Sequence, residues 1–396
     1  MIMEKKKKPE IRFEGFTDDW EQRKLKDVYG SIGNAFVGTA TPYYVEHGHF
    51  YLESNNIKDG KINHNSEIFI NDEFYEKQKE KWLHTGDIVM VQSGHVGHAA
   101  VIPEELDNTA AHALIMFKNP KEKIEPYFLN YEYQTDKAKK KIENITTGNT
   151  IKHILASDMQ EFEVDVPKCK EQKVIASYFC KLDHLITLHQ RKYEKLKNVK
   201  KSMLEKMFPS KGCKVPEIRF SGFTDDWEQR KLGELAEIVG GGTPSTSVES
   251  YWDGDIDWYA PAEIGEQIYL KSSQRKITEE GLNKSSAKVL PVGTVLFTSR
   301  AGIGKIAILL KEGCTNQGFQ SIVPNKDKLD SYFIFTRSEE LKRYGETVGA
   351  GSTFVEVSGK QMANMELMMP TTMDEQQKIG EYFSNLDNLI TLHQCK

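Results

Sequence analysis

Apolar side chains recur at heptad spacing along residues 171–208 and again along residues 375–396. The first segment carries Ile175, Leu182, His189, Leu196 and Met203 at a positions, Tyr178, Leu185 and Val199 at d positions, and Phe179, Ile186, Tyr193 and Met207 beside them. The second segment repeats this stripe with Ile379, Leu386, His393, Tyr382, Leu389, Phe383 and Ile390. A stripe of this width predicts two long helices that each pack along another helix. Thr372-x-x-Glu375 forms a capping box at the start of the second.

The chain also repeats itself at the ends of two larger blocks. Residues 9–25 (PEIRFEGFTDDWEQRKL) return almost unchanged at residues 216–232, and residues 171–192 return at residues 375–396. The middles of the two copies differ strongly, although each keeps a short apolar run after a glycine, at residues 86–90 and 293–297. Free drift after a duplication would spread changes evenly. Fixed ends and divergent middles favour ends that dock a common partner and middles that recognise different targets.

The repeat and the heptads together predict the domain organisation. We expect an α+β protein with two globular mixed α/β domains, each followed by a long helix, and the two helices pairing as an antiparallel coiled coil. The predicted parts are a first globular domain at residues 9–168, a central helix at 169–208, a linker at 209–215, a second globular domain at 216–371 and a short distal helix at 372–396. His189 and His393, both at a positions, are interpreted as polar residues that set the register of the coiled coil.

Composition narrows the class of protein. No run of 18 apolar residues exists, and the lysine tract at residues 1–8 has no apolar stretch behind it, so neither a membrane span nor a secretory signal is expected. The five cysteines are scattered and form no CxxC pair, which favours reduced thiols in the cytoplasm over a disulfide frame or a zinc site. The net charge of −5 is unusual for a nucleic-acid binder.

Positive charge is nevertheless concentrated locally. Residues 170–208 hold ten Lys/Arg against four Asp/Glu, and residues 135–153 hold five lysines that lead into a polar loop at 148–153. A polar loop of this kind can approach a phosphate backbone. Because the whole chain is acidic, we expect partner subunits to add affinity for DNA.

Signals for catalysis are weak. Residues 301–305 (AGIGK) resemble the end of a P-loop, but Ser299 and Ile306 occupy positions where that motif needs glycine and Ser/Thr. His95-x-x-His98 is not repeated as a histidine pair in the second copy, where Gly302 and Lys305 take these positions. Both segments are interpreted as glycine-supported polar loops after a buried strand. No nucleophilic triad or methyltransferase motif is evident, so the chain is not expected to be an enzyme or to bind a metal or cofactor itself.

The combination of the PEIRFEGFTDDWEQRKL opening, GGTPS at residues 241–245, GTVLFTSRAGIGK at 293–305 and the EQxxI…YF…LD.LI..H helices resembles the specificity subunit of type I restriction–modification systems. The resemblance covers essentially the whole chain in order. It implies two target-recognition domains that each read one half of a split, asymmetric DNA target. It also implies docking to two methyltransferase subunits and to restriction subunits, with S-adenosylmethionine, ATP and Mg²⁺ bound by those partners.

The residues expected to act follow from these loops and helices. We predict DNA contacts from His95, His98, Asn149, Thr150, Lys152, Thr243, Ser245, Arg300, Lys305, Ser352 and Thr353. Arg300 is the leading candidate for a base contact, since a guanidinium group can pair bidentately with guanine. Subunit docking is predicted at Leu182, Leu185, Ile186, Leu386, Leu389 and Ile390.

Two alternatives remain open at this stage. A non-catalytic coiled-coil scaffold that binds only proteins would also contain the two long helices. A stand-alone nuclease or NTPase would require metal- or ATP-dependent turnover by the isolated chain. The second helix stops at LHQCK where the first continues for a further 16 residues to Phe208. Because the last helix of the resembling family commonly runs on, the completeness of the distal docking surface is open.

Overall fold

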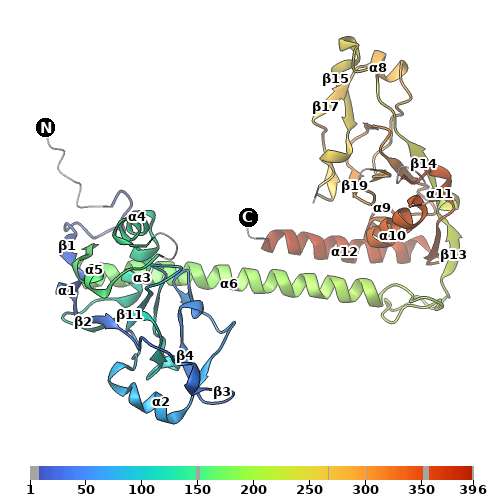
Figure 1. The fold of residues 1–396 in the computed structure, drawn as a ribbon. Coiled ribbons are helices and arrows are strands. Elements are labelled where there is room, and N and C mark those ends of the chain that lie inside the picture. The colour runs from blue at the N-terminus through green and yellow to red at the C-terminus, as the bar shows by residue number, and fades with distance from the viewer. Residues whose placement is uncertain (1–8, 149–151, 266, 301, 351–355, 395–396) are drawn as a thin grey trace. The chain divides into compact units, whose positions relative to one another are not determined.

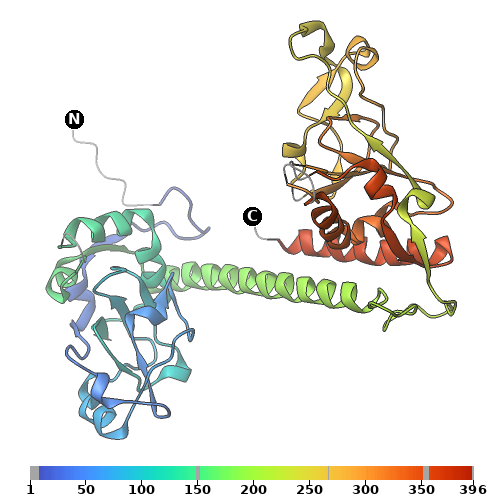
Figure 2. The same cartoon turned by 45° about the vertical axis from the view of Figure 1, so that its right-hand side comes forward.

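The computed structural model describes residues 9–148, 152–265, 267–300, 302–350 and 356–394. The chain divides into two compact units, Met1–Thr187 and Leu188–Lys396, each of which is described by itself (Figures 1 and 2). The division falls inside the long helix α6 (Cys169–Lys206) and not in the predicted linker at 209–215. The reason is packing, because Met203 of this helix and Met207, just after its end, belong to the hydrophobic core of the second unit or pack against it.

The first unit is a mixed α/β structure, and its elements precede or lead into α6. Its strands are β1 (Glu21–Lys24), β2 (Tyr29–Asn34), β3 (Tyr44–Val45), β4 (His49–Leu52), β5 (Ile57–Lys58), β6 (Lys61–Ile62), β7 (Phe69–Ile70), β8 (Ile88–Val91), β9 (Ala99–Val101), β10 (Ala110–Ala111), β11 (Leu114–Pro120) and β12 (Glu163–Val166). Its helices before α6 are α1 (Leu25–Val28), α2 (Asp72–Lys77), α3 (Pro126–Gln134), α4 (Asp136–Ile145) and α5 (Ala156–Glu161).

The core of the first unit surrounds an antiparallel sheet of order β2-β11-β8-β9. Strand β8 is buried along its whole length, as expected from its four consecutive apolar residues. Phe128 of α3 and Met159 of α5 pack in the cluster with Ile88 and Met90, while Val89 and Val91 belong to a second cluster. The sheet therefore has apolar side chains packed on both of its faces. A further sheet has the order β10-β4-β7-β3.

The second unit repeats this plan with different lengths. Its strands are β13 (Glu228–Lys231), β14 (Ala236–Gly240), β15 (Trp252–Tyr259), β16 (Tyr269–Leu270), β17 (Arg275–Ile277), β18 (Val295–Phe297), β19 (Ile306–Leu309), β20 (Cys314–Thr315), β21 (Gln320–Pro324) and β22 (Glu366–Met369). Its helices after α6 are α7 (Leu232–Leu235), α8 (Glu279–Asn283), α9 (Ser331–Thr336), α10 (Ser338–Gly349), α11 (Gly359–Ala363) and α12 (Met373–His393). Its larger sheets have the orders β14-β21-β18-β19-β16 and β17-β15-β20.

The repeated ends of each copy pair with one another. Strand β1 lies antiparallel to β12, with Glu21 opposite Val166, and β13 lies antiparallel to β22, with Glu228 opposite Met369. In each unit the opening string of the repeat is thus joined to the strand that leads into a long helix. From the sequence alone, Trp20 and Trp227 in the repeated FTDDWEQRKL string are most simply core anchors at a helix start, capped by Thr or Asp. The helix start is wrong, because the residues that follow them form β1 and β13. Their role as core anchors is confirmed by Trp227, which is buried, and by Trp20, which packs against the core.

A buried ion pair ties each opening string to the first turn of its helix. Arg12 donates from Nε and Nη2 to the two carboxylate oxygens of Glu171 at 2.6 Å, and Trp20 Nε1 donates to Glu171 Oε1 at 3.3 Å. In the second unit Arg219 makes the same two bonds to Glu375 at 2.7 and 2.8 Å, and Trp227 donates to Glu375 Oε1 at 3.3 Å. These bonds explain in structural terms why the ends of the repeat are nearly identical in the two copies.

The glutamine after each of these glutamates accepts an equivalent backbone hydrogen bond in the two units. Gln172 Oε1 accepts from the backbone N–H of Glu125, just before α3, and Gln376 Oε1 accepts from that of Asp330, just before α9. Each Gln side chain also donates to a backbone carbonyl, that of Pro167 or Lys328. The Glu-Gln pair therefore anchors the start of the long helix on two sides.

Within the second unit, α12 runs antiparallel to the C-terminal half of α6. His189 Nδ1 lies 2.8 Å from His393 Nδ1, and farther along α6 Lys200 Nζ donates to Asp387 Oδ1 at 2.6 Å. The ring centroid of Phe208, two residues after the end of α6, lies 6.3 Å from that of Phe383. Because residue numbers rise on one helix as they fall on the other, the two directions are opposite. The Thr372 hydroxyl accepts from the Glu375 backbone N–H at 3.3 Å, which confirms the Thr372 half of the predicted capping box, whereas the Glu375 carboxylate accepts from Arg219 and Trp227.

We expect acidification to weaken this helix pair. Burial, Lys192 and His189 lower the pKa of His393 below its usual value. Since the unfolded chain then takes up the proton more readily than the folded one, stability is retained above about pH 6.5 and falls as the pH drops below it. The melting temperature should therefore fall between about pH 8 and about pH 5.5. His393→Gln should reduce this dependence, whereas His184→Gln, at an exposed position of α6, should leave it unchanged; equal curves for all three proteins would contradict the prediction.

Candidate nucleic-acid interface

The loops after β8 and β18 have the same backbone structure in both units. Val91 N–H donates to His98 O at 2.8 Å and Gly97 N–H to Val91 O at 3.0 Å, and Thr298 with Lys305 and Gly304 forms the matching bonds at 2.9 and 3.0 Å. Gly97 and Gly304 adopt φ values of +88° and +96°, which side-chain-bearing residues rarely adopt. The prediction of glycine-supported loops after a buried strand is confirmed.

In the first unit this loop lies beside the strand-like segment that precedes α5. Gly94 N–H donates to Lys152 O at 3.1 Å, and Ser93 and His153 form a β-bridge. The loop, Lys152 and one side of α4 surround a hollow of about 390 Å³. The predicted residues His95, His98 and Lys152 are therefore brought together, while Asn149 and Thr150 lie outside the described residues.

The lysines of α4 divide into two groups. Lys137 pairs with Asp165, and Lys141 donates to the backbone carbonyl of Glu163, so these two hold α4 against β12. Lys139 instead lines the hollow together with Lys152, whose ammonium group is 3.1 Å from Glu143 Oε1. Lys139 was not singled out as a contact from the sequence, since a run of lysines does not show which side chains face which surface.

His98 is held as a neutral ring. Its Nδ1 accepts from the Asp59 backbone N–H at 3.2 Å, which places the proton of the neutral tautomer on Nε2. Burial is the main cause that lowers the pKa of His98; Asp59 opposes this effect, while His95 and Lys139 add to it. An uncharged donor of this kind is suited to a hydrogen bond with a base edge or a phosphate, whereas the lysines supply the positive charge.

In the second unit three separate segments meet beside the equivalent loop. Gly242 N–H donates to Thr315 O and Ser299 N–H to Gly318 O, both at 2.8 Å. The hydroxyl group of Thr243 donates to the side-chain oxygen of Gln317. Residues 315–318 are therefore hydrogen-bonded both to the GGTPS string and to the loop after β18. The GGTPS string and this loop, which were both predicted to contact DNA, thus lie next to each other although they are distant in the sequence.

Arg300 stands at the junction of these segments and is half exposed. It forms a β-bridge with Glu356, and its Nη1 lies 4.0 Å from Glu356 Oε2. This distance is at the limit of an ion pair, so the guanidinium group retains hydrogen-bonding capacity. Lys305 is exposed at the other end of the loop, where its backbone N–H donates to the buried Thr298 hydroxyl at 2.9 Å.

The remaining predicted contacts are placed less uniformly. Ser245 is exposed, and its hydroxyl group lies 2.8 Å from that of Ser247. Ser352 and Thr353 lie outside the described residues. Gln317, which touches Thr243, was missed from the sequence because a polar residue between a glycine and an asparagine gives no signal of its own.

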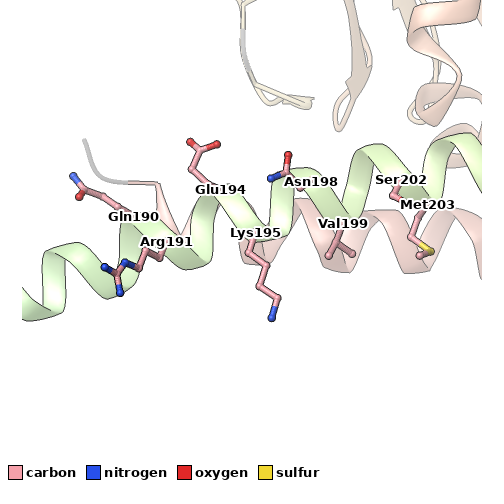
Figure 3. A pocket seen from close by; sticks show the side chains of 8 residues that line it. All are labelled: Gln190, Arg191, Glu194, Lys195, Asn198, Val199, Ser202 and Met203. Carbon is pink, nitrogen blue, oxygen red and sulfur yellow. The ribbon is translucent and has the colours of Figure 1, made fainter. Parts of the chain in front are cut away.

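The predicted docking residues differ in exposure. Leu182, Leu185 and Ile186 in the first unit are exposed, as is Leu389, whereas Ile390 is half-buried and Leu386 is buried in the second unit. On the C-terminal half of α6, an open hollow of about 700 Å³ follows the helix and is lined by residues of mixed character from Gln190 to Met203 (Figure 3). In that view Glu194 and Asn198 point to one side of the helix, and Arg191 and Lys195 to the other.

The chemistry of these surfaces is that of binding. The described part of the chain contains no group of three or more His, Cys, Asp or Glu side chains that could hold a metal ion. None of the described helices combines enough length and apolar character to cross a membrane. Both candidate interfaces consist of loop hydroxyls, amides and basic groups, which hydrogen-bond to phosphates and base edges.

Comparison with known proteins assigns the family. The model of the type I restriction modification DNA specificity domain matches residues 17–198 and again residues 224–396. The chain belongs to this specificity family. The two matches coincide with the two copies of the repeat. The expectation of a chain that confers specificity without catalysing a reaction agrees with this family.

Individual relatives of the specificity family agree. The type I restriction enzyme MjaIX specificity subunit of Methanocaldococcus jannaschii is 38% identical over 168 residues, which are 42% of this chain and 39% of that protein. The putative MjaX specificity subunit of the same organism is 28% identical over 389 residues, which are 95% of this chain and 88% of that protein. The crystal structure of a type-I restriction-modification system S subunit from M. genitalium has a TM-score of 0.61 at 14% identity, covering 95% of this chain and 91% of that one. This structural likeness concerns the fold, and it agrees with the predicted α+β class.

Proposed function

We propose that this chain is the sequence-reading subunit of a type I restriction–modification complex, in which each unit contacts one half of a split, asymmetric DNA target. The observation that carries the proposal is the pair of equivalent loops after β8 and β18, which share one backbone structure but carry different side chains. His95 and His98 in the first unit correspond to Gly302 and Lys305 in the second. Different side chains on one scaffold are suited to different half-sites.

The helices have a separate role in this proposal. At about 1.5 Å per residue, the 38 residues of α6 span roughly 57 Å, enough to hold two readers about one turn of DNA apart, roughly 34–36 Å. Two methyltransferase subunits and the restriction subunits would dock on the helices and would bind S-adenosylmethionine, ATP and Mg²⁺ themselves. We expect the complex to act in the cytoplasm.

The direct test is co-expression of the chain with the methyltransferase subunit of a type I restriction–modification system, followed by mapping of methylated adenines. The expected result is a complex that methylates one bipartite sequence with two different halves. A complex that methylates a symmetric or unsplit sequence would contradict the split-target proposal, and a chain that binds proteins but no specific DNA would favour a scaffold.

Lys152→Ala should weaken DNA binding by a similar factor for all sequences. Its ammonium group lines the hollow beside the loop at residues 94–98 and is expected to neutralise a phosphate. The slope of log affinity against log salt concentration should become smaller in magnitude by about one. Lys137→Ala is the matched control, because Lys137 pairs with Asp165 on β12 and is not among the residues that line the hollow. A loss confined to one base position would instead identify Lys152 as a base contact.

A further inference from the structure

The GGTPS string at residues 241–245 is held by two tryptophan side chains of the second unit. Trp258 Nε1 donates to the backbone carbonyl of Gly242 at 2.9 Å, and Trp252 Nε1 donates to that of Ser245 at 3.1 Å. Both indole groups are buried, and they meet edge to face with ring centroids 5.1 Å apart. Two buried donors therefore fix the backbone of the string at two points.

The two glycines of the GGTPS string are also tightly packed. A Cβ atom on Gly241 would collide with the backbone carbonyl of Asn316, and one on Gly242 would collide with the backbone of Ser286 and Ala287. Only glycine allows so close an approach of backbone to backbone. The string is therefore a rigid part of the second unit and not an adaptable loop.

Arg275 reaches the same pair of tryptophans from the neighbouring strand. It is the first residue of β17 and lies opposite Trp258 of β15 (Figure 1). Its guanidinium carbon is 3.7 Å from the centroid of the Trp252 ring and 6.0 Å from that of Trp258. At 3.7 Å the flat guanidinium group stacks on the indole face. Because Trp252 also bonds to Ser245, this group stands one indole ring away from the end of the GGTPS string.

Stacking leaves the N–H donors of Arg275 unused. The residue is exposed, and within the described residues its guanidinium group has no ion-pair partner and no hydrogen-bond acceptor. Arg337 of the same unit, by contrast, is buried and donates to Glu340. Arg275 also belongs to the divergent middle of the repeat, where differences between the two half-sites are expected. A guanidinium group with a fixed plane and free donors is preorganised for a bidentate hydrogen bond.

We propose that Arg275 reads a guanine of the second half-site, with its plane held by Trp252 and its free N–H donors directed at the O6 and N7 atoms of the base in the major groove. This inference rests on the proposed function and deepens it, because it assigns a base type to a residue that the sequence did not single out. Trp252 acts as a positioning residue, since it orients the guanidinium group without touching the DNA.

Arg275 and Arg300 approach the GGTPS string from opposite sides. The strand order β17-β15-β20 puts Arg275 two strand spacings, about 10 Å, from Cys314. Arg300 lies beyond β20, where the loop after β18 meets residues 315–318. Since successive base pairs are about 3.4 Å apart, we expect the guanine about three base pairs away from the position that Arg300 contacts.

The test uses the full chain in complex with methyltransferase subunits and DNA that carries the mapped target. Arg275→Met keeps a long side chain that can cover Trp252 but removes every donor. It should weaken binding to the target by about 5- to 150-fold and abolish discrimination at one G·C pair. Replacing that guanine by 7-deazaguanine, which lacks the N7 acceptor, should weaken binding of the unaltered complex but have no further effect on the Arg275→Met complex. Arg275→Lys keeps the charge but not the planar pair of donors, so it should also lose the discrimination.

The matched control is Lys276→Met, at the next position of β17. The Lys276 side chain lies on the other face of the sheet, 3.9 Å from the Asp257 carboxylate, which also pairs with Lys311 at 3.1 Å. This variant should leave discrimination unchanged.

Two results would overturn the proposal. An equal loss of affinity of Arg275→Met for every sequence would show that Arg275 contacts a phosphate. A lower melting temperature with unchanged discrimination would show that Arg275 only covers Trp252. If the unaltered complex had no sequence preference, the proposed function itself would fail, whereas intact discrimination in Arg275→Met would contradict only the present proposal.

Discussion

Glu375→Gln should destabilise the second unit by about 3 kcal/mol, because it leaves the buried Arg219 guanidinium without its counter-charge. Arg219 and Glu375 have side chains that are 10% and 1% exposed, and both carboxylate oxygens accept from the guanidinium group. These bonds raise the pKa of Arg219 in the native protein; without them the guanidinium group still stays charged, because arginine is not deprotonated near neutral pH. At about 2–4 °C per kcal/mol for a unit of this size, the melting temperature should fall by roughly 6–12 °C.

The matched control for this variant is Glu381→Gln, which removes an exposed charge from the same helix and should change stability by no more than about 0.5 kcal/mol. Glu171→Gln should reproduce the large loss in the first unit, where Arg12 and Trp20 hold the same carboxylate. If Glu375→Gln were as stable as Glu381→Gln, the buried pair would not be what joins the opening string to the helix.

Arg300→Ala should lower affinity for the target by about 1–3 kcal/mol, roughly 5- to 150-fold, and the loss should be confined to one base pair. The reason is geometric. Arg300 lies where the loop after β18 meets residues 315–318, and its weak contact with Glu356 leaves its planar donors available for a base edge. In competition binding against targets altered one position at a time, the variant should lose discrimination at a single position.

Two further variants help to distinguish the possible causes of the effect of Arg300→Ala. Arg300→Lys keeps the charge but not the planar pair of donors, so it should resemble Arg300→Ala in discrimination. Gln317→Ala, at the neighbouring polar position, should alter discrimination at the same or an adjacent base pair. An equal loss of affinity of Arg300→Ala for every sequence would instead mark Arg300 as a phosphate contact.

The heptad positions, the capping box and the repeated strings were sufficient to predict two long helices, two mixed α/β units and the loops after β8 and β18. These features depend on local periodicity and on glycines, which a sequence displays directly. The same local signals misled at Trp20 and Trp227. The segment after each of them pairs with a strand more than 130 residues away and so becomes a strand itself.

Only the tertiary structure decided which charged and polar groups meet. The partners in the Arg12–Glu171 and Arg219–Glu375 pairs lie more than 150 residues apart, and Thr243 and Gln317 come together from different loops. Likewise, Phe179 and Phe383 have nearly the same sequence surroundings, yet one is exposed and the other buried. The sequence by itself determined the helices and their apolar stripes, because those depend on spacing along the chain. Whether a stripe is covered depends on a segment elsewhere, and this long-range packing separates the exposed Phe179 of α6 from its buried counterpart on α12.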